Sequence, residues 1–373
     1  MCVFPTTRDR RIVIEPGVSV QRVAWVVGQR AGACRIVPTE PMRRLVECVR
    51  MPVCRYLAWG WGPAESRSPQ GFVESEGYMS LTRREMLIAS GAALLGPAVT
   101  ARLRAGSLAA KKILFFTKSS GFEHPAIHRD GDKLGYAERV LQTIGKEHGF
   151  EVVCSKDGGL FAPDKIGEWD AFVFYTTGDL TKSGTDKQTP ISEDNLKGFI
   201  DRIHAGKAGF VGVHSATDTL GDHRGLGDKD PYTQMIGGQF NGHGAQGPVE
   251  LFVTDPTFPG ATGLKDRFTM TDEWYSQKYQ PENLHVILAH DTSTMQKLGN
   301  DYARPNYPQT WAKPWGEGRV FHSSMGHRED VWDNPIFQGL VLGGLTWATR
   351  QADCDITPNV KKVTPEFQTL QKK

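Results

Sequence analysis

A histidine stands at the end of an apolar run near the middle of the chain. Residues 209–213 read GFVGV, and His214 follows them directly. A run of this kind indicates a buried strand, and its abrupt end delivers the next side chain to the edge of a sheet. Gly212 and Ala216 lie two positions to either side of the histidine. A sharp strand-to-helix turn needs such small neighbours, as in the nucleophile elbow G-x-S-x-G. The sequence therefore predicts an elbow with histidine at its tip.

Two other interpretations of this turn stay open. His214 could be a structural residue that bonds a nearby loop. Ser215 could instead be the nucleophile, but a serine needs a neighbouring base to activate it, and no clear partner is visible.

Further candidate groups fall in segments that would connect strands. His124 lies in SSGFEHPAI, His243 in FNGHG, and His327 after a strand-like run that ends SSMG. Asp272 and Glu273 are adjacent in TMTDEWY. Neighbouring residues of a strand point to opposite faces, so only one carboxylate can face the site. We choose Glu273.

Two chemistries suit these groups. Histidine titrates near neutral pH, so His214, Glu273 and His327 could act as general acid and base beside a carbonyl. Alternatively, three or four of the histidines together with a carboxylate could bind Zn²⁺ or another divalent metal ion and leave one position open, with His214, His243 and His327 as the expected histidine ligands. No short H-x-x-x-H spacing supports the metal site.

Substrate contacts are expected from the same segments. The predicted substrate-binding residues are His124, Ser215, Asp218, Trp274 and Tyr275. Aromatic rings offer flat faces to a sugar, and Trp311 and Trp332 are further candidates. Core packing is the alternative role for each tryptophan.

The elements that would carry these residues predict an α/β fold. Apolar strand-like runs and amphipathic helices alternate over the first half, with strands at 111–118, 150–156, 170–177 and 208–215 and helices at about 130–148 and 192–207. This alternation is typical of a parallel sheet covered on both faces. Ligands bind beyond the carboxyl ends of the strands in such sheets, where His214 would lie.

The second half of the chain predicts additional, partly antiparallel strands. The strand-like segments are 248–255, 267–275, 284–291, 309–315 and 318–325. The last two are joined by GEG, a hairpin signal. A helix is expected from Asn334-Pro335 to residue 350. The residues from 352 onward read as a loose polar tail, and 181–190 as a flexible insertion.

Several of these stretches together resemble the ThuA-like (trehalose-utilisation) family over residues 111–350. They are GFEHPAI, GFVGVHSATDT, GGQFNGHG, TDEWY and GEGRVFHSSMGHREDVWDNPIFQGLVLGGLTWA. The resemblance implies a class I glutamine amidotransferase-like fold, which is a flavodoxin-like three-layer α/β/α sandwich. The elbow residue of true amidotransferases is cysteine, whereas here it is His214. Imidazole does not simply replace a thiolate nucleophile, so we exclude glutaminase activity.

The resemblance also implies a substrate class. The family name derives from disaccharide use, and relatives are linked to oxidised 3-keto sugars. The leading interpretation is an exported carbohydrate-active enzyme. With or without a metal ion, it would perform isomerisation, elimination or hydrolysis on a keto-sugar or glycoside. The alternative is a non-catalytic sugar-binding or interaction module that keeps a relic site.

The opening of the chain differs in composition from the rest. Residues 1–78 contain neither lysine nor histidine but four of the six cysteines. From Met79 onward, twin arginines precede an apolar stretch and small residues, as in a twin-arginine export signal. We therefore expect a mis-assigned start (1–78), a signal peptide (79–108), a ThuA-like domain (109–351), a polar tail (352–373) and a periplasmic or secreted location. A small Arg/Cys-rich domain and a buried helix are the alternatives for the first two segments.

Charge and cysteine content limit the partners. The net charge of +2 over 373 residues gives no sign of a nucleic-acid partner. No apolar run reaches the roughly 18 residues of a membrane span. Only Cys154 and Cys354 lie beyond the proposed signal, so a disulfide framework is not expected. A small carbohydrate is the expected partner, and a homo-oligomer stays open.

Overall fold

The computed structural model describes residues 11–14, 33–39, 43–49 and 110–370. The chain divides into two units at about residue 101. The described strands of the first unit are β1 (Arg11–Ile14), β2 (Ala33–Thr39) and β3 (Arg43–Val49), which pair antiparallel in the order β1-β3-β2. The expected signal peptide, 79–108, lies outside the described residues, as does most of the 1–78 extension.

The second unit is built on a nine-stranded sheet with the order β12-β11-β14-β15-β16-β9-β7-β4-β6. Its parallel part consists of β6 (Phe150–Ser155), β4 (Lys111–Phe116), β7 (Ala171–Phe174), β9 (Gly209–Val213) and β16 (Gly318–Ser323). Its antiparallel part consists of β15 (Pro308–Trp315), β14 (His285–His290), β11 (Gly247–Val253) and β12 (Arg267–Asp272). The expected mixed α/β fold, a parallel sheet with added antiparallel strands, is confirmed.

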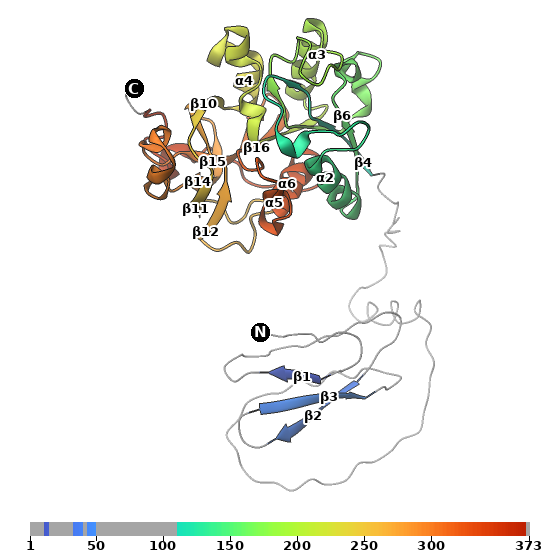
Figure 1. Ribbon diagram of the computed structural model, residues 1–373, viewed down its shortest axis with the longest axis vertical. Coiled ribbons are helices and arrows are strands. Elements are labelled where there is room, and N and C mark those ends of the chain that lie inside the picture. The colour runs from blue at the N-terminus through green and yellow to red at the C-terminus, as the bar shows by residue number, and fades with distance from the viewer. Residues whose placement is uncertain (1–10, 15–32, 40–42, 50–109, 371–373) are drawn as a thin grey trace, which may run out of the picture. The chain divides into compact units, whose positions relative to one another are not determined.

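Helices pack against both faces of this sheet (Figure 1). One face contacts α2 (Tyr136–Glu147) and α6 (Pro335–Ala348), and the other contacts α3 (Glu193–His204) and α4 (Pro231–Ile236). Strand β4 illustrates why helices cover both faces of the sheet. Its alternate residues point to opposite faces, so Phe115 packs on the α2 side and Phe116 on the α3 side, both fully buried. Strands buried on both faces read as continuous apolar runs, which made them visible in the sequence.

Shorter elements complete the description. They are β5 (Ser119–Ser120), β8 (Thr177–Gly178), β10 (Gln239–His243), β13 (Tyr275–Tyr279), α5 (Glu329–Trp332) and α7 (Val360–Val363). The expected helix starts are confirmed, because the Ser192 side chain caps α3 and Asn334 caps α6 ahead of Pro335.

The last residues are polar, but the expectation that they are loose was wrong. Val360 and Phe367 are buried in an apolar cluster with Val286 of β14. Asn359 Oδ1 also accepts a hydrogen bond of 2.6 Å from the Val286 N–H. Val360 and Phe367 therefore anchor a C-terminal segment whose residues are mostly polar.

The 181–190 insertion is also anchored rather than simply flexible. Lys118 Nζ lies 2.9 Å from Asp186 Oδ1, and both side chains are almost fully buried. The same ammonium donates to the Gln188 carbonyl at 2.9 Å. A buried charge requires such partners, so this ion pair fixes the segment against the end of β4.

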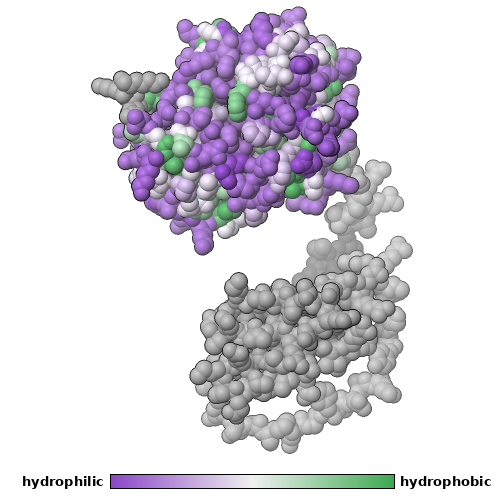
Figure 2. All heavy atoms as spheres, in the orientation of Figure 1, coloured by the Kyte–Doolittle hydropathy of each residue, from purple (hydrophilic) through white to green (hydrophobic). Residues whose placement is uncertain are grey.

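The face of the second unit shown in Figure 2 is predominantly hydrophilic, with apolar residues in small separate patches. Among the described residues, no helix combines the length and hydrophobicity needed to cross a bilayer. Cys154 and Cys354 are both free thiols.

Candidate active site

His214 follows β9, which lies between β7 and β16 at the centre of the parallel strands. Its backbone φ is +46°, which is rare for a residue with a side chain, and a 3₁₀ turn (His214–Thr217) follows. A Cβ on Gly212 would lie 3.2 Å from the Cβ of Ala216 and still closer to neighbouring side chains. The predicted strand-end position and tight turn are confirmed, and the small flanking residues are a steric requirement.

Four side chains from four different loops converge at this turn. They are His124, His214, Glu273 and His327, and one donor atom of each lies within 4.8 Å of all the others. His327 Nδ1 lies 3.1 Å from Glu273 Oε2 and 3.3 Å from His214 Nε2. His214 Nε2 lies 3.6 Å from the same carboxylate oxygen. The polar side-chain atoms of His214, Glu273 and His327 therefore lie close together and face one another.

The two adjacent carboxylates have different surroundings. Glu273 faces the histidines, whereas the buried Asp272 accepts hydrogen bonds from the Gly326 N–H at 2.7 Å and the Arg328 N–H at 3.2 Å. These two amides flank His327 in the chain. Asp272 thus fixes the loop that carries His327.

The predicted histidines differ in exposure. His214 is fully buried and His124 is 2% exposed, whereas the side chains of Glu273 and His327 are 10% and 13% exposed. A surface pocket of about 490 Å³ reaches the cluster at His327 and at Pro125, the residue after His124. His327 is therefore the member of the cluster that a molecule in this pocket would meet first.

His243 lies at the rim and outside the four-residue cluster. Its side chain is 41% exposed, and its Nδ1 lies 3.5 Å from Glu273 Oε1, the carboxylate oxygen that faces away from His214 and His327. The cluster therefore differs from the expected metal-binding histidines His214, His243 and His327, because it contains His124 and not His243.

Hydrogen bonds and burial determine the protonation of the cluster. His214 Nδ1 lies 3.1 Å from the Ser324 carbonyl, which can only accept, so Nδ1 carries the proton and the Nε2 lone pair of the neutral ring faces the cluster. Burial and the neighbouring histidines lower the pKa of His124 to about 2. Burial raises the pKa of Glu273, but the contacts of its carboxylate with His214 and His327 outweigh that effect, so the net shift is downward. Glu273 is thus an anion among imidazoles at neutral pH.

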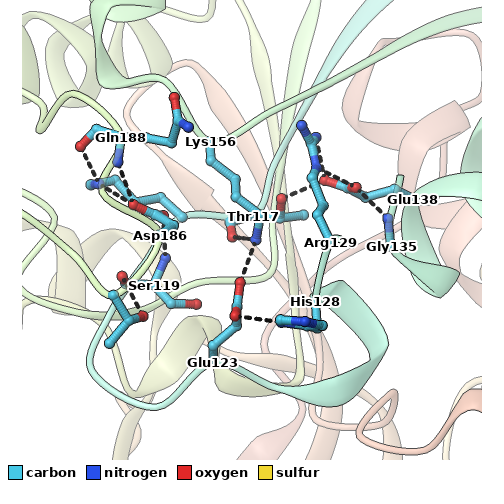
Figure 3. Close-up of polar contacts among 12 residues, drawn as sticks. Thr117, Ser119, Glu123, His128, Arg129, Gly135, Glu138, Lys156, Asp186 and Gln188 are labelled. Atoms are coloured by element: carbon cyan, nitrogen blue, oxygen red, sulfur yellow. Dashed lines mark hydrogen bonds and ion pairs between the residues drawn. The ribbon is translucent and has the colours of Figure 1, made fainter. Parts of the chain in front are cut away.

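The loop that carries His124 is held by ion pairs on both sides (Figure 3). Lys156 Nζ lies 3.1 Å from Glu123 Oε1, immediately before His124. Downstream, Arg129 donates two hydrogen bonds, of 2.6 and 2.8 Å, to the buried Glu138 of α2. The histidine therefore sits in a loop whose ends are fixed by buried charges.

The tryptophans were wrongly expected to present flat faces to a sugar. Trp274, Trp311 and Trp332 are at most 1% exposed. Each indole N–H donates to a main-chain carbonyl, at 2.8 to 2.9 Å. Large aromatic residues stabilise a core when their polar edge finds a partner, and here each one does.

The other residues that were expected to contact the substrate have different surroundings. Ser215 is fully buried, and its hydroxyl finds no hydrogen-bond partner among the described residues. Asp218 Oδ1 pairs with His223 at 2.9 Å. Tyr275 borders the cluster, with its ring centroid 4.3 Å from that of His214 and its hydroxyl 3.4 Å from His124 Nε2.

Two aromatic residues near the cluster were missed in the sequence. Phe122 is 64% exposed, and its ring lies edge-on to that of His124 with centroids 4.9 Å apart. Tyr175 follows β7 and is fully buried, and within the described part of the chain its hydroxyl has no hydrogen-bond partner; its ring centroid lies 5.3 Å from that of His124. The end of the apolar run 171–174 signals Tyr175 by the same logic that singled out His214. Phe122 was visible as an apolar residue in a polar loop.

The fold and site define an α/β protein with a histidine elbow and a buried cluster of three histidines and a carboxylate. The family described as trehalose utilisation, ThuA, matches residues 112–348, well over half of the chain. The chain belongs to this family, and the resemblance seen in its motifs is confirmed. Membership indicates a carbohydrate-related role.

Solved structures show similar chains at low identity. A protein described as ThuA-like from Bacteroides uniformis is 18% identical, with a TM-score of 0.49 over 71% of this chain and 100% of that one. Another from Parabacteroides merdae is 19% identical, with a TM-score of 0.48 over 71% and 97%. A beta-galactosidase from Bacillus circulans is 11% identical, with a TM-score of 0.39 over 67% and 32%. No curated protein sequence matches the chain significantly.

Proposed function

We propose that the protein is an enzyme that performs proton-transfer chemistry on a carbohydrate, with His214, Glu273 and His327 as its catalytic groups. The substrate class is a keto-sugar or a glycoside, and the reaction class is isomerisation, elimination or hydrolysis. The observation that carries the proposal is the 3.1 Å contact between Glu273 Oε2 and Nδ1 of His327, a residue that lines a surface pocket.

The protonation states assign different roles to these groups. The lowered pKa of Glu273 makes its carboxylate a weak base. Its role is to orient His327 and to stabilise the imidazolium that forms when His327 takes a proton. The hydrogen on the carbon next to the carbonyl is the most acidic carbon-bound hydrogen of a keto-sugar. His214 and Tyr275 border the place where the resulting negative charge would develop.

The pocket and its rim suit a sugar. Gln246, Arg328 and Asp330 line the pocket and offer donors and acceptors for hydroxyl groups. The exposed ring of Phe122 lies beside His124 and offers an apolar face to the C–H side of a sugar ring. The pocket lining is mostly polar, which suits a ligand with many hydroxyl groups.

Substitution of the pocket-facing histidine tests the proposal. A panel of 3-keto-sugars and glycosides is incubated with the wild type and with His327→Ala, which should lower the rate by about 10²–10⁴-fold. The matched control is His148→Ala, an exposed histidine after α2, which should leave the rate unchanged. If the wild type binds these sugars without converting any of them, the protein is instead the sugar-binding module with a relic site.

We also propose the finer architecture and the location that the sequence suggested. Helices on both faces of the sheet support the three-layer, flavodoxin-like arrangement. The composition of residues 79–108 supports twin-arginine export to the periplasm or beyond. Changing Arg83 and Arg84 to lysine in the full chain should keep the protein in the cytoplasm. Equal export of this variant and the wild type would contradict the location.

A further inference from the structure

We infer that His124, His214, Glu273 and His327 bind one divalent transition-metal ion. This goes beyond the proposed function and concerns a separate state of the cluster, because the ion would bind the same atoms of Glu273 and His327 that the proton transfer uses, whether or not the substrate is a sugar. The geometry points to it first. Ligand bonds to Zn²⁺ are about 2.0–2.2 Å long, which places the ligand atoms of a tetrahedral site about 3.4 Å apart. The three measured separations among His214, Glu273 and His327 are 3.1, 3.3 and 3.6 Å.

The fourth ligand completes the site. A ring nitrogen of His124 lies within 4.8 Å of the other three donor atoms. The ring is buried, and the ion pairs on both sides of its loop keep it facing the cluster. Three imidazoles and one carboxylate thus surround a common point.

The charge of the cluster calls for a cation. Within the described ranges, every ion-pair partner of Glu273 is a histidine: His214, His243 or His327. A buried carboxylate needs either protons on those rings or a metal ion between them. The Ser324 carbonyl accepts a hydrogen bond from the Nδ1–H group of His214, so the Nε2 lone pair of His214 is directed at Glu273 and His327.

Supporting contacts have the form seen around metal ligands. A metal-binding histidine usually donates its other N–H to a carbonyl or carboxylate, as His214 does to Ser324. Asp272 fixes the main chain on both sides of His327. Three nitrogens and one oxygen suit Zn²⁺, Fe²⁺ or Mn²⁺, whereas Ca²⁺ and Mg²⁺ prefer oxygen alone.

The rim histidine provides a matched control. His243 is 41% exposed and touches only the outer oxygen of Glu273, so the inference excludes it from the ligands. It is nevertheless a histidine beside the same carboxylate. A metal held loosely by any nearby imidazole would depend on His243 as much as on His124.

The test uses the full chain stripped with a chelator and titrated with ZnCl₂ and, separately, MnCl₂ by calorimetry. We expect one equivalent of at least one of the two ions to bind. Loss of supporting contacts around metal ligands typically weakens affinity about 10–100-fold. His124→Ala and His327→Ala should therefore weaken it by at least about 100-fold, and His243→Ala by less than about threefold. Failure to bind either ion stoichiometrically, or equal losses in His124→Ala and His243→Ala, would overturn the inference.

A measurement on the wild type protects the test against variants that fail to fold. Co²⁺ added to the metal-free protein should give the intense visible absorption of a four-coordinate site rather than the weak spectrum of a six-coordinate ion. A weak spectrum contradicts the ligand set. Metal binding without sugar turnover would refute the proposed function alone, and turnover that survives complete metal removal, in a protein that binds neither ion, would refute the metal site alone.

Discussion

The elbow depends on the absence of a side chain at residue 212, so Gly212→Ala tests it directly. The added Cβ would lie 2.7 Å from His322 Nδ1 and 2.9 Å from Ile236 Cδ1, both shorter than real Cβ contacts. The His322 ring cannot move away freely, because it is fully buried and packs against Trp311 with centroids 4.4 Å apart. The crowding must therefore shift the turn that holds His214.

The size of the effect follows from overpacking. Adding a methyl group to a well-packed interior destabilises a protein by about 1–3 kcal/mol. For a domain of this size, each kcal/mol lowers the melting temperature by about 2–4 °C, so we expect a fall of about 2–12 °C. Turnover should fall further, because a displacement of about 1 Å at a catalytic group reduces the rate about 10²-fold.

Thermal unfolding followed by circular dichroism measures the effect. The matched control is Gly198→Ala in the exposed part of α3, where a Cβ meets nothing within 4 Å. Alanine is the better helix former, so this control should stabilise the protein by about 0.5–1 kcal/mol. If Gly212→Ala is as stable as Gly198→Ala and keeps full activity, the steric account of the elbow is wrong.

Three further substitutions have defined outcomes. His290 is buried and its pKa is lowered to about 3, so the unfolded chain gains a proton near pH 6.5 that the folded chain does not. Stability should therefore fall as the pH drops below about 6.5, by up to ~1.4 kcal/mol per pH unit, and urea unfolding of His290→Phe should show a flatter profile. Lys118→Met leaves Asp186 as an unpaired buried charge and should lower the unfolding free energy by about 3–5 kcal/mol; a loss below 1 kcal/mol in urea would mean that the pair does not anchor the insertion. Phe122→Ala should raise KM about tenfold with little change in kcat, since stacking adds about 1–2 kcal/mol, while Leu226→Ala, also exposed, should change neither.

The sequence predicted those elements whose signals are local. The apolar run of β9, the flanking Gly212 and Ala216, and the caps at Ser192 and Asn334 are all visible within a few residues. Each of them formed the expected strand, turn or helix start.

The composition of the cluster could not be predicted in the same way. His124 and His243 both lie in glycine-containing stretches of the sequence, although His243 is the last residue of β10, and contacts across the fold distinguish their positions. The ion pair of Lys156 with Glu123 holds the first loop against the cluster, whereas the second lies at the surface. Contacts between residues far apart in the chain leave no periodic pattern in a single sequence.

Burial of single side chains was equally hidden. Trp274 lies next to Glu273 in the chain, yet its ring is in the core while the carboxylate faces the site. Both residues lie in the short connection between β12 and β13, outside either strand, so no strand alternation in the sequence marks the difference. The tail shows the converse, since Val360 and Phe367 decide its packing although most of its residues are polar.

The central claim is that His327 and Glu273 move a proton at a carbon of a keto-sugar. Its most direct measurement is proton NMR of 3-keto-sugars incubated with the enzyme in D₂O. Exchange of the hydrogen next to the carbonyl reports proton abstraction even when no net product accumulates. The account predicts exchange with the wild type and loss of at least about 10²-fold in its rate with His327→Ala. Equal exchange rates in both proteins, or no exchange and no glycoside cleavage by the wild type across the panel, would contradict it.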